Sequence, residues 1–357
     1  QVSPYVRVQA LMARASVALF SGEWDQATAD LEEALAIVEN AAGDQEALLA
    51  LMLFLGQEFT MLPGKLGRIE AFCNGVQESL GAPLARSESS GLRPVRLGLR
   101  DVLAFIHLRR GRLHEAIATG ERAILHKEQL GGYYPFLGLN AAITVATAQA
   151  ALGNYEAAGR YLGLMEPAVS ALPLNQHTVA NGLFPRARTY WQQGRDEDVR
   201  AVYAEMRALA ADEESPQAQV LRMVVGSFIH IAEGAYEKAA EALVRAEELA
   251  ESAPLSSIYV CPQIIRASAL QRAGKGDAAL EAFAPRLVSC EEDGTPGVIL
   301  QEGQTAVALL ELAVEAGVHA QYAGQLLGQL QRQPLAAEKP ALPEEVSPLT
   351  ERELEVL

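Results

Sequence analysis

The seven-residue stretch LGNYEAA, residues 152–158, decides the fold class, because related stretches recur along the whole chain. Each carries a glycine at its second position and, in most cases, a small residue five places after that glycine. The other copies are SGEWDQA at Gly22, LGRIEAF at Gly67, RGRLHEA at Gly111, QGRDEDV at Gly194, EGAYEKA at Gly234, AGKGDAA at Gly274 and the weaker AGVHAQY at Gly317. Successive glycines are 45, 44, 42, 41, 40, 40 and 43 residues apart. Intervals this regular predict a repeat architecture.

The repeat glycines predict where helices end, because glycine adopts the left-handed conformation of a helix C-terminus without steric cost. An acidic residue often follows three places later, as Glu156 does, where it favours the N-terminus of a second helix. Small and large residues then share one helix face, for example Ala158, Leu162 and Met165. We therefore predict an all-α chain of about eight antiparallel helix pairs that stack into a right-handed superhelix over residues 1–332.

The motif resembles the tetratricopeptide repeat (TPR), which has the same glycine, an aromatic residue two places later and an alanine five places later. Trp24, Tyr155 and Tyr236 occupy the aromatic position. The family's period is 34 residues, whereas the interval here is about 40. The resemblance therefore implies a TPR-like variant with longer helices. Two places depart from the repeat. Pro63 and Gly64 stand just before Gly67 and predict a longer turn there, and residues 81–94, rich in Pro, Ser and Gly, predict a loop.

The composition narrows the classes of partner. The chain has 357 residues, 29 Lys and Arg against 45 Asp and Glu, and a net charge of −16, which disfavours nucleic-acid binding by its own surface. Its three cysteines, Cys73, Cys261 and Cys290, form no CxxC pair, which favours neither a disulfide framework nor a zinc site and fits the cytoplasm. The longest apolar run, residues 48–55, is far shorter than the roughly 18 residues of a membrane helix. We expect a cytoplasmic protein with no membrane partner.

The last residues differ in character from the repeats. Residues 333–348 contain four prolines and predict an extended linker. LTERELEVL follows at residues 349–357, where Thr350 and Glu353 form a capping box that begins a new helix. A helix that starts so close to the last residue, in a chain whose first residue is Gln1, predicts an excised fragment of a longer protein.

LTERELEVL resembles the opening of the LuxR-type helix-turn-helix domain. Together with helical repeats of about 40 residues, it resembles the MalT-like large ATP-binding LuxR-family transcriptional regulators. The resemblance implies that the superhelix senses an effector, that an ATPase domain and the DNA reader lie in missing parts, and that the full-length protein can oligomerise. Because this chain contains no G-x-x-x-x-G-K-[ST] motif, we expect no cofactor in this fragment, with ATP bound only in a missing N-terminal domain. DNA contact is likewise expected only through the missing C-terminal domain.

Binding residues are predicted from position in the repeat, because the first helix of each pair lines the concave groove of such a stack. Amide, guanidinium and aromatic side chains at those positions suit a polar small molecule. The candidates are Asn140, Asn181, Phe184, Arg188, Trp191, Gln192, Phe228 and Gln271. Large aromatic residues are usually core residues, so packing between repeats is the alternative for Trp191 and Phe184.

The sequence contains no catalytic or metal-binding motif. None of the six histidines forms HExxH, and the acidic clusters at residues 212–214 and 291–293 are typical of a solvated surface. We therefore predict a non-enzymatic regulatory domain that binds a small-molecule effector or a protein partner. Two alternatives stay open. One is a protein-binding TPR scaffold, for which the net charge of −16 would suit a basic partner, and the other is an α-helical toroid enzyme.

Overall fold

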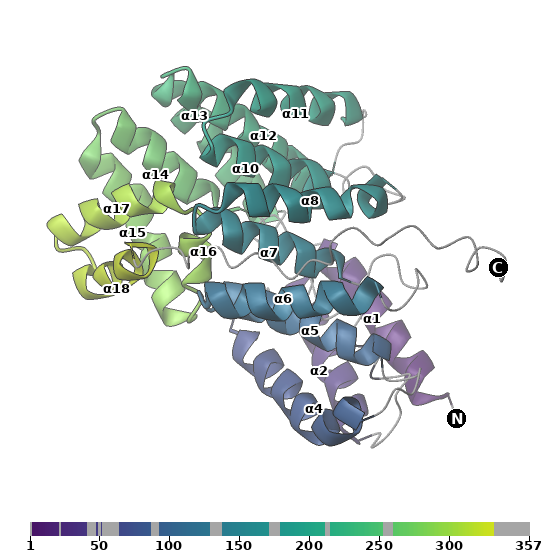
Figure 1. Ribbon diagram of the computed structural model, residues 1–357. Helices are drawn as coiled ribbons and strands as arrows, with labels where there is room; N and C mark the ends of the chain where they lie inside the picture. The colour runs from purple at the N-terminus through teal and green to yellow at the C-terminus, as the bar shows by residue number, and fades with distance from the viewer. Residues whose placement is uncertain are drawn as a thin grey trace.

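The computed structural model describes residues 2–20, 23–40, 48, 51, 64–86, 93–128, 138–170, 179–210, 215–252 and 260–331. Within these ranges all regular structure is helical, as predicted, with sixteen α-helices, one π-helix and no strand (Figure 1). The helices of the first half are α1 (Pro4–Phe20), α2 (Trp24–Asn40), α4 (Leu66–Arg86), α5 (Arg93–Arg109), α6 (Leu113–Glu128), α7 (Leu139–Ala151) and α8 (Tyr155–Ser170). The remaining ones are η2 (Val179–Leu183), α10 (Phe184–Gln192), α11 (Asp196–Leu209), α12 (Pro216–Ala232), α13 (Tyr236–Ser252), α14 (Pro262–Arg272), α15 (Gly276–Glu292), α16 (Gly297–Leu300), α17 (Gln304–Glu315) and α18 (Ala320–Gln331).

The repeat glycines form the turn between the two helices of a pair. Six of them have φ angles between 70° and 81°, which is the left-handed conformation predicted for them, namely Gly111, Gly153, Gly194, Gly234, Gly274 and Gly317. The prediction is wrong for the second copy, because Gly67 lies in the first turn of α4 and Gly64, with φ 69°, is the left-handed residue. Pro63 precedes Gly64 and cannot continue a helix, which moves the turn three residues towards the N-terminus. Gly22 lies outside the described residues.

The loop predicted over residues 81–94 is shorter than expected. Residues 81–86 continue α4 and residues 93–94 begin α5, while residues 87–92 lie outside the described part. Pro94 is tolerated because it stands in the first turn of α5, where its missing N–H has no helical partner to lose.

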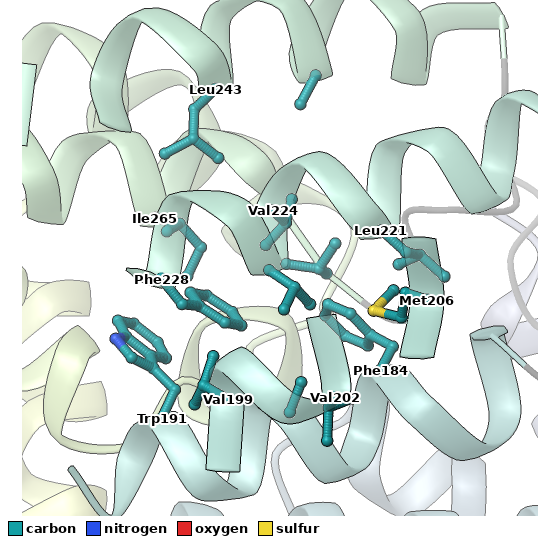
Figure 2. Packing of buried hydrophobic residues seen from close by; sticks show 14 of the residues in the cluster. Phe184, Trp191, Val199, Val202, Met206, Leu221, Val224, Phe228, Leu243 and Ile265 are labelled. Carbon is teal, nitrogen blue, oxygen red and sulfur yellow. The ribbon is translucent and has the colours of Figure 1, made fainter. Parts of the chain in front are cut away.

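The helices are arranged in two layers. The first helices of successive pairs contact one another in the order α5, α7, α10, α12, α14 and α17. The second helices α6, α8, α11, α13 and α15 each pack against their own first helix and against the first helix of the next pair. Helices that share a face in this way bury a continuous apolar layer between them. The cluster in Figure 2 is one part of that layer, in which the rings of Trp191 and Phe228 stack with centroids 4.1 Å apart.

One segment departs from the repeat pattern. Residues 294–303, here called the crossing segment, join α15 to α17 and contain the short helix α16. α16 contacts α5, which lies nearly 190 residues earlier in the chain, and Figure 1 shows α16 beside the ends of α6 and α7. Arg110 Nη1 donates a hydrogen bond of 2.8 Å to the Gly294 carbonyl. The backbone of Gly297 lies so close to α5 that a Cβ atom there would stand 1.7 Å from the Leu108 carbonyl oxygen.

The predicted linker and reader both lie beyond the described residues. Residues 333–348 and residues 349–357, including the LTERELEVL stretch, fall within the undescribed range 332–357. None of the described helices combines the length and the apolar character that a membrane span needs.

Candidate functional site

A cavity lies between α5, α7 and α10 on the first-helix layer, where the crossing segment forms part of its wall. We call it the α7–α10 cavity. Its volume is about 40 Å³, which at roughly 10–15 Å³ for each water position holds about three waters. Its lining residues are Phe105, Leu108, Asn140, Ile143, Thr144, Ala146, Thr147, Ala150, Phe184, Pro185, Arg188, Thr189, Gln192 and Gln301.

The repeat explains why one face of α7 enters the cavity. Asn140, Ile143, Thr144 and Thr147 are spaced by three or four residues and therefore lie on one side of the helix. Apolar side chains from α5 cover the opposite wall. The cavity therefore combines an apolar surface with a few polar groups, which is the usual make-up of a small-molecule site.

Two amide side chains in the cavity wall have unused hydrogen-bonding atoms. Gln192 Nε2 donates a 3.3 Å bond to the Gln301 carbonyl, but Gln192 Oε1 is buried and has no hydrogen-bond partner within the described residues. Gln301 is only 3% exposed, and its Nε2 is likewise buried with no partner there. Because a buried polar atom without a partner costs free energy, a ligand that bonded to these atoms would gain from them.

A buried ion pair joins the cavity wall at Arg188 to the crossing segment. Arg188 Nη2 on α10 donates to Glu302 Oε1, and the Glu302 side chain is 0% exposed. Burial raises the pKa of Glu302 above its ordinary value, although the charge and the hydrogen bond of Arg188 act in the opposite direction. Glu302 Oε2 is buried and has no hydrogen-bond partner in the described ranges. The charge of Arg188 therefore balances the Glu302 carboxylate, but only one of its two oxygens has a hydrogen-bond partner among the described residues.

The structure brings together four of the eight predicted site residues. Asn140, Phe184, Arg188 and Gln192 all line the α7–α10 cavity. Asn181 belongs to η2, and the structure does not describe its side chain.

The three other predicted residues do not line the cavity. Trp191 and Phe228 stack on each other in the buried core (Figure 2), which is the packing role weighed for Trp191 as the alternative. Gln271 Nε2 donates a 3.0 Å hydrogen bond to the Ala308 carbonyl and so links α14 to α17.

Sequence reasoning missed Gln301 and Glu302, because the crossing segment does not follow the repeat. Its sequence offered one signal. The stretch DGTPGVILQEG, residues 293–303, holds three glycines and a proline where a helix of the last pair would otherwise begin. Such a cluster indicates an insertion that interrupts the repeat, but it does not say which part of the molecule the insertion contacts.

A second hollow lies between α8, α10 and α11, here called the α8–α11 hollow. Its volume is about 730 Å³, and its charged and aromatic lining residues include Tyr155, Glu166, Arg186, Tyr190, Arg195 and Glu205. Arg186 pairs there with Glu166 at 3.5 Å and with Glu205 at 3.0 Å. Arg195 lies over the ring of Tyr190, 4.3 Å from its centroid. Both guanidinium groups therefore have partners within the protein, although Arg186 Nε is itself buried with no hydrogen-bond partner among the described residues.

No group of three or more His, Cys, Asp or Glu side chains in the described ranges is arranged to hold a metal ion. No protein-family model matches this chain, and no curated protein sequence matches it either.

Proposed function

We propose that this chain is an effector-sensing domain that binds a small polar molecule in the α7–α10 cavity. The observation that carries the proposal is that Gln192 and Gln301, which line a cavity with apolar walls, each hold a buried amide atom (Oε1 and Nε2) with no hydrogen-bond partner among the described residues. One of these atoms accepts a hydrogen bond and the other donates one. A ligand with both kinds of group, such as a sugar, an amino acid or an amide, fits that chemistry.

The wider assignment rests on the sequence. Repeats at intervals of about 40 residues, followed by a proline-rich stretch and LTERELEVL, support a TPR-like right-handed superhelix within a bacterial LuxR-family, MalT-like transcriptional activator. In that setting the chain would act in the cytoplasm, while ATP binding, DNA contact and oligomerisation would belong to other parts of the full-length protein.

The proposed mechanism is a population shift. Ligand binding favours the arrangement of α7, α10 and the crossing segment that has the higher ligand affinity, and the other domains respond to that arrangement. If a full-length protein kept effector-dependent oligomerisation after residues 1–332 were deleted, this mechanism would be wrong.

The test is a thermal-shift screen of the chain against sugars, amino acids, nucleotides and short peptides. A ligand present at 100 times its dissociation constant adds about 2.7 kcal/mol to the unfolding free energy. Two neighbouring glutamines provide a matched pair of variants, because Gln192 lines the α7–α10 cavity and Gln193 lines the α8–α11 hollow. We expect Gln192→Ala to abolish the shift and Gln193→Ala to retain it.

A second candidate function is a protein-binding scaffold, and the width of the α8–α11 hollow favours it. A hollow of about 730 Å³ accommodates an extended peptide, which the α7–α10 cavity does not. The same screen separates the two functions. If only peptides shift the melting temperature, and Gln193→Ala rather than Gln192→Ala removes the effect, the scaffold function is correct.

A further inference from the structure

The α7–α10 cavity presents a single ionisable side chain among its described lining residues, and that side chain is cationic. It is Arg188, whose guanidinium is paired with Glu302 from the crossing segment. The other polar lining groups are amides and hydroxyls. A guanidinium recognises carboxylates through parallel N–H donors, so the charge of the cavity selects for an anion.

Glu302 already places a carboxylate on the guanidinium that such a ligand would bind. The two partners are 114 residues apart in the sequence, so the pair joins the crossing segment to α10 rather than neighbouring turns of one helix. Because Glu302 is fully buried and its Oε2 has no hydrogen-bond partner among the described residues, the carboxylate has lost its hydration without full replacement. A carboxylate in this state is poorly stabilised compared with one that makes several hydrogen bonds.

We propose that the ligand of the α7–α10 cavity carries a carboxylate and displaces Glu302 from Arg188. The inference rests on the proposed function and names the chemical class of its ligand. A bound carboxylate takes over the guanidinium and can also accept from Gln301 Nε2, while Glu302 returns to water and is hydrated again. The new hydrogen bonds of the ligand and the rehydration of Glu302 both favour replacement of Glu302 by the ligand carboxylate.

The exchange also enlarges the site. The cavity holds only about three waters while the crossing segment is in place, so a molecule of metabolite size needs this wall to move. The polar contacts that hold the wall include Arg188 with Glu302, Gln192 Nε2 with the Gln301 carbonyl, and Arg110 Nη1 with the Gly294 carbonyl. A ligand carboxylate competes with the contact between Arg188 and Glu302. The contact of Gln192 is made to Gln301, the residue just before Glu302. Ligand binding therefore loosens the crossing segment at Gln301–Glu302.

The experiment compares carboxylates with their neutral amides, using acetate against acetamide and succinate against succinamide at constant ionic strength. Binding is followed by calorimetry, and the crossing segment is followed by hydrogen exchange of residues 294–303. We expect the wild-type chain to bind the carboxylates and not the amides, with faster exchange in residues 294–303 when a carboxylate is bound. We expect Glu302→Gln, which removes the internal competitor, to tighten carboxylate binding by at least about tenfold.

Two further variants make the result specific. Glu247→Gln is the matched control, since Glu247 forms a partly buried pair with Arg266 at 2.6 Å that links α13 to α14, and it should not change carboxylate affinity. The double variant R188Q/E302Q removes both charges of the pair and should lose the preference for carboxylates. It also decides the question if Glu302→Gln alone does not fold.

Three outcomes would overturn the inference. Amides that bind as well as carboxylates, with binding lost in Gln192→Ala, would leave the proposed function intact and exclude the carboxylate. Carboxylate binding that Glu302→Gln and R188Q/E302Q do not alter would place the anion elsewhere on the chain. If neither these probes nor the wider screen gave binding, the inference and the proposed function would both be wrong.

Discussion

The replacement Gly297→Ala tests whether the crossing segment is seated on α5. A Cβ atom at Gly297 would stand 1.7 Å from the Leu108 carbonyl oxygen and 2.9 Å from the Arg109 carbonyl carbon. Even a close carbon–oxygen contact is about 3.3 Å, so the segment would have to move by about 1.6 Å. The obstacle is backbone, which cannot rotate away as a side chain can. The φ angle of Gly297 is not positive, so alanine tolerates the conformation and the effect is purely steric.

The structure brackets the size of the effect. If the segment adjusts in place, the strain is that of an overpacked core, about 1–3 kcal/mol. If it detaches, Val298, Ile299 and Leu300, all buried, are exposed, and at about 1.5–3 kcal/mol each the loss reaches at most about 9 kcal/mol. We expect the unfolding free energy to fall by at least about 1 kcal/mol, and hydrogen exchange of residues 294–303 to accelerate.

The assay is urea unfolding followed by circular dichroism, with Gly75→Ala as the control. Gly75 lies inside α4, and a Cβ atom added there would meet no neighbouring atom within 4 Å, so alanine should stabilise the chain by about 0.5–1 kcal/mol. A Gly297→Ala chain with wild-type stability and wild-type exchange in residues 294–303 would refute the seating of the crossing segment on α5.

Three other predictions concern single side chains. The hydrogen bond from Arg14 lowers the pKa of Asp30 in the folded chain. The ionised carboxylate therefore stabilises the fold above the unfolded-state pKa, and this stabilisation is lost as the pH falls through the folded-state pKa. In urea unfolding at graded pH, the difference in unfolding free energy between wild type and Asp30→Asn should narrow below about pH 4. The buried hydroxyl of Tyr161 donates a 2.5 Å hydrogen bond to a carboxylate on α6, so Tyr161→Phe should cost about 1.5–3 kcal/mol of unfolding free energy. Tyr322→Phe should cost nothing by the same measurement, because the buried Tyr322 hydroxyl has no hydrogen-bond partner in the described part of the chain, and equal losses in the two variants would contradict both assignments. Burial raises the pKa of the Cys73 thiol to about 12, so a disulfide reagent at pH 8 should label Cys73 no faster than the chain unfolds, and rapid labelling of the native chain would contradict its burial.

The repeat turns could be predicted from sequence because their cause is local. A glycine at a helix end adopts the left-handed conformation whatever the rest of the chain does, and Gly153 and Gly234 behave accordingly. The prediction failed at Gly67, where a second glycine three residues earlier follows a proline and takes over the turn. The spacing of the repeats could not show whether Gly64 or Gly67 is the left-handed residue of the turn. Pro63 favours Gly64, because proline disrupts a helix.

The candidate site was predictable only where it follows the repeat. Asn140 and Arg188 occupy equivalent faces of α7 and α10, so the distance of each from its repeat glycine placed both in the cavity. Adjacent helix residues point about 100° apart, which is why Gln192 reaches the cavity while Trp191 packs in the core. Glu302 could not be predicted, because its partner lies 114 residues away and no periodic pattern joins them.

The contact between Arg110 and Gly294 also changes how the chain can come apart. A stack in which each pair touches only its neighbours unravels from either end, one pair at a time. Here a hydrogen bond between residues 184 positions apart closes the stretch from α5 to α15 into a ring, and a ring has no free end from which to unravel. The helices of that ring should therefore unfold together, whereas α1, α2 and α4 before it and α17 and α18 after it lie outside it and can open first. Closing the ring in folding requires an encounter between distant residues, so it should be the slow and final step by which the chain reaches its native state.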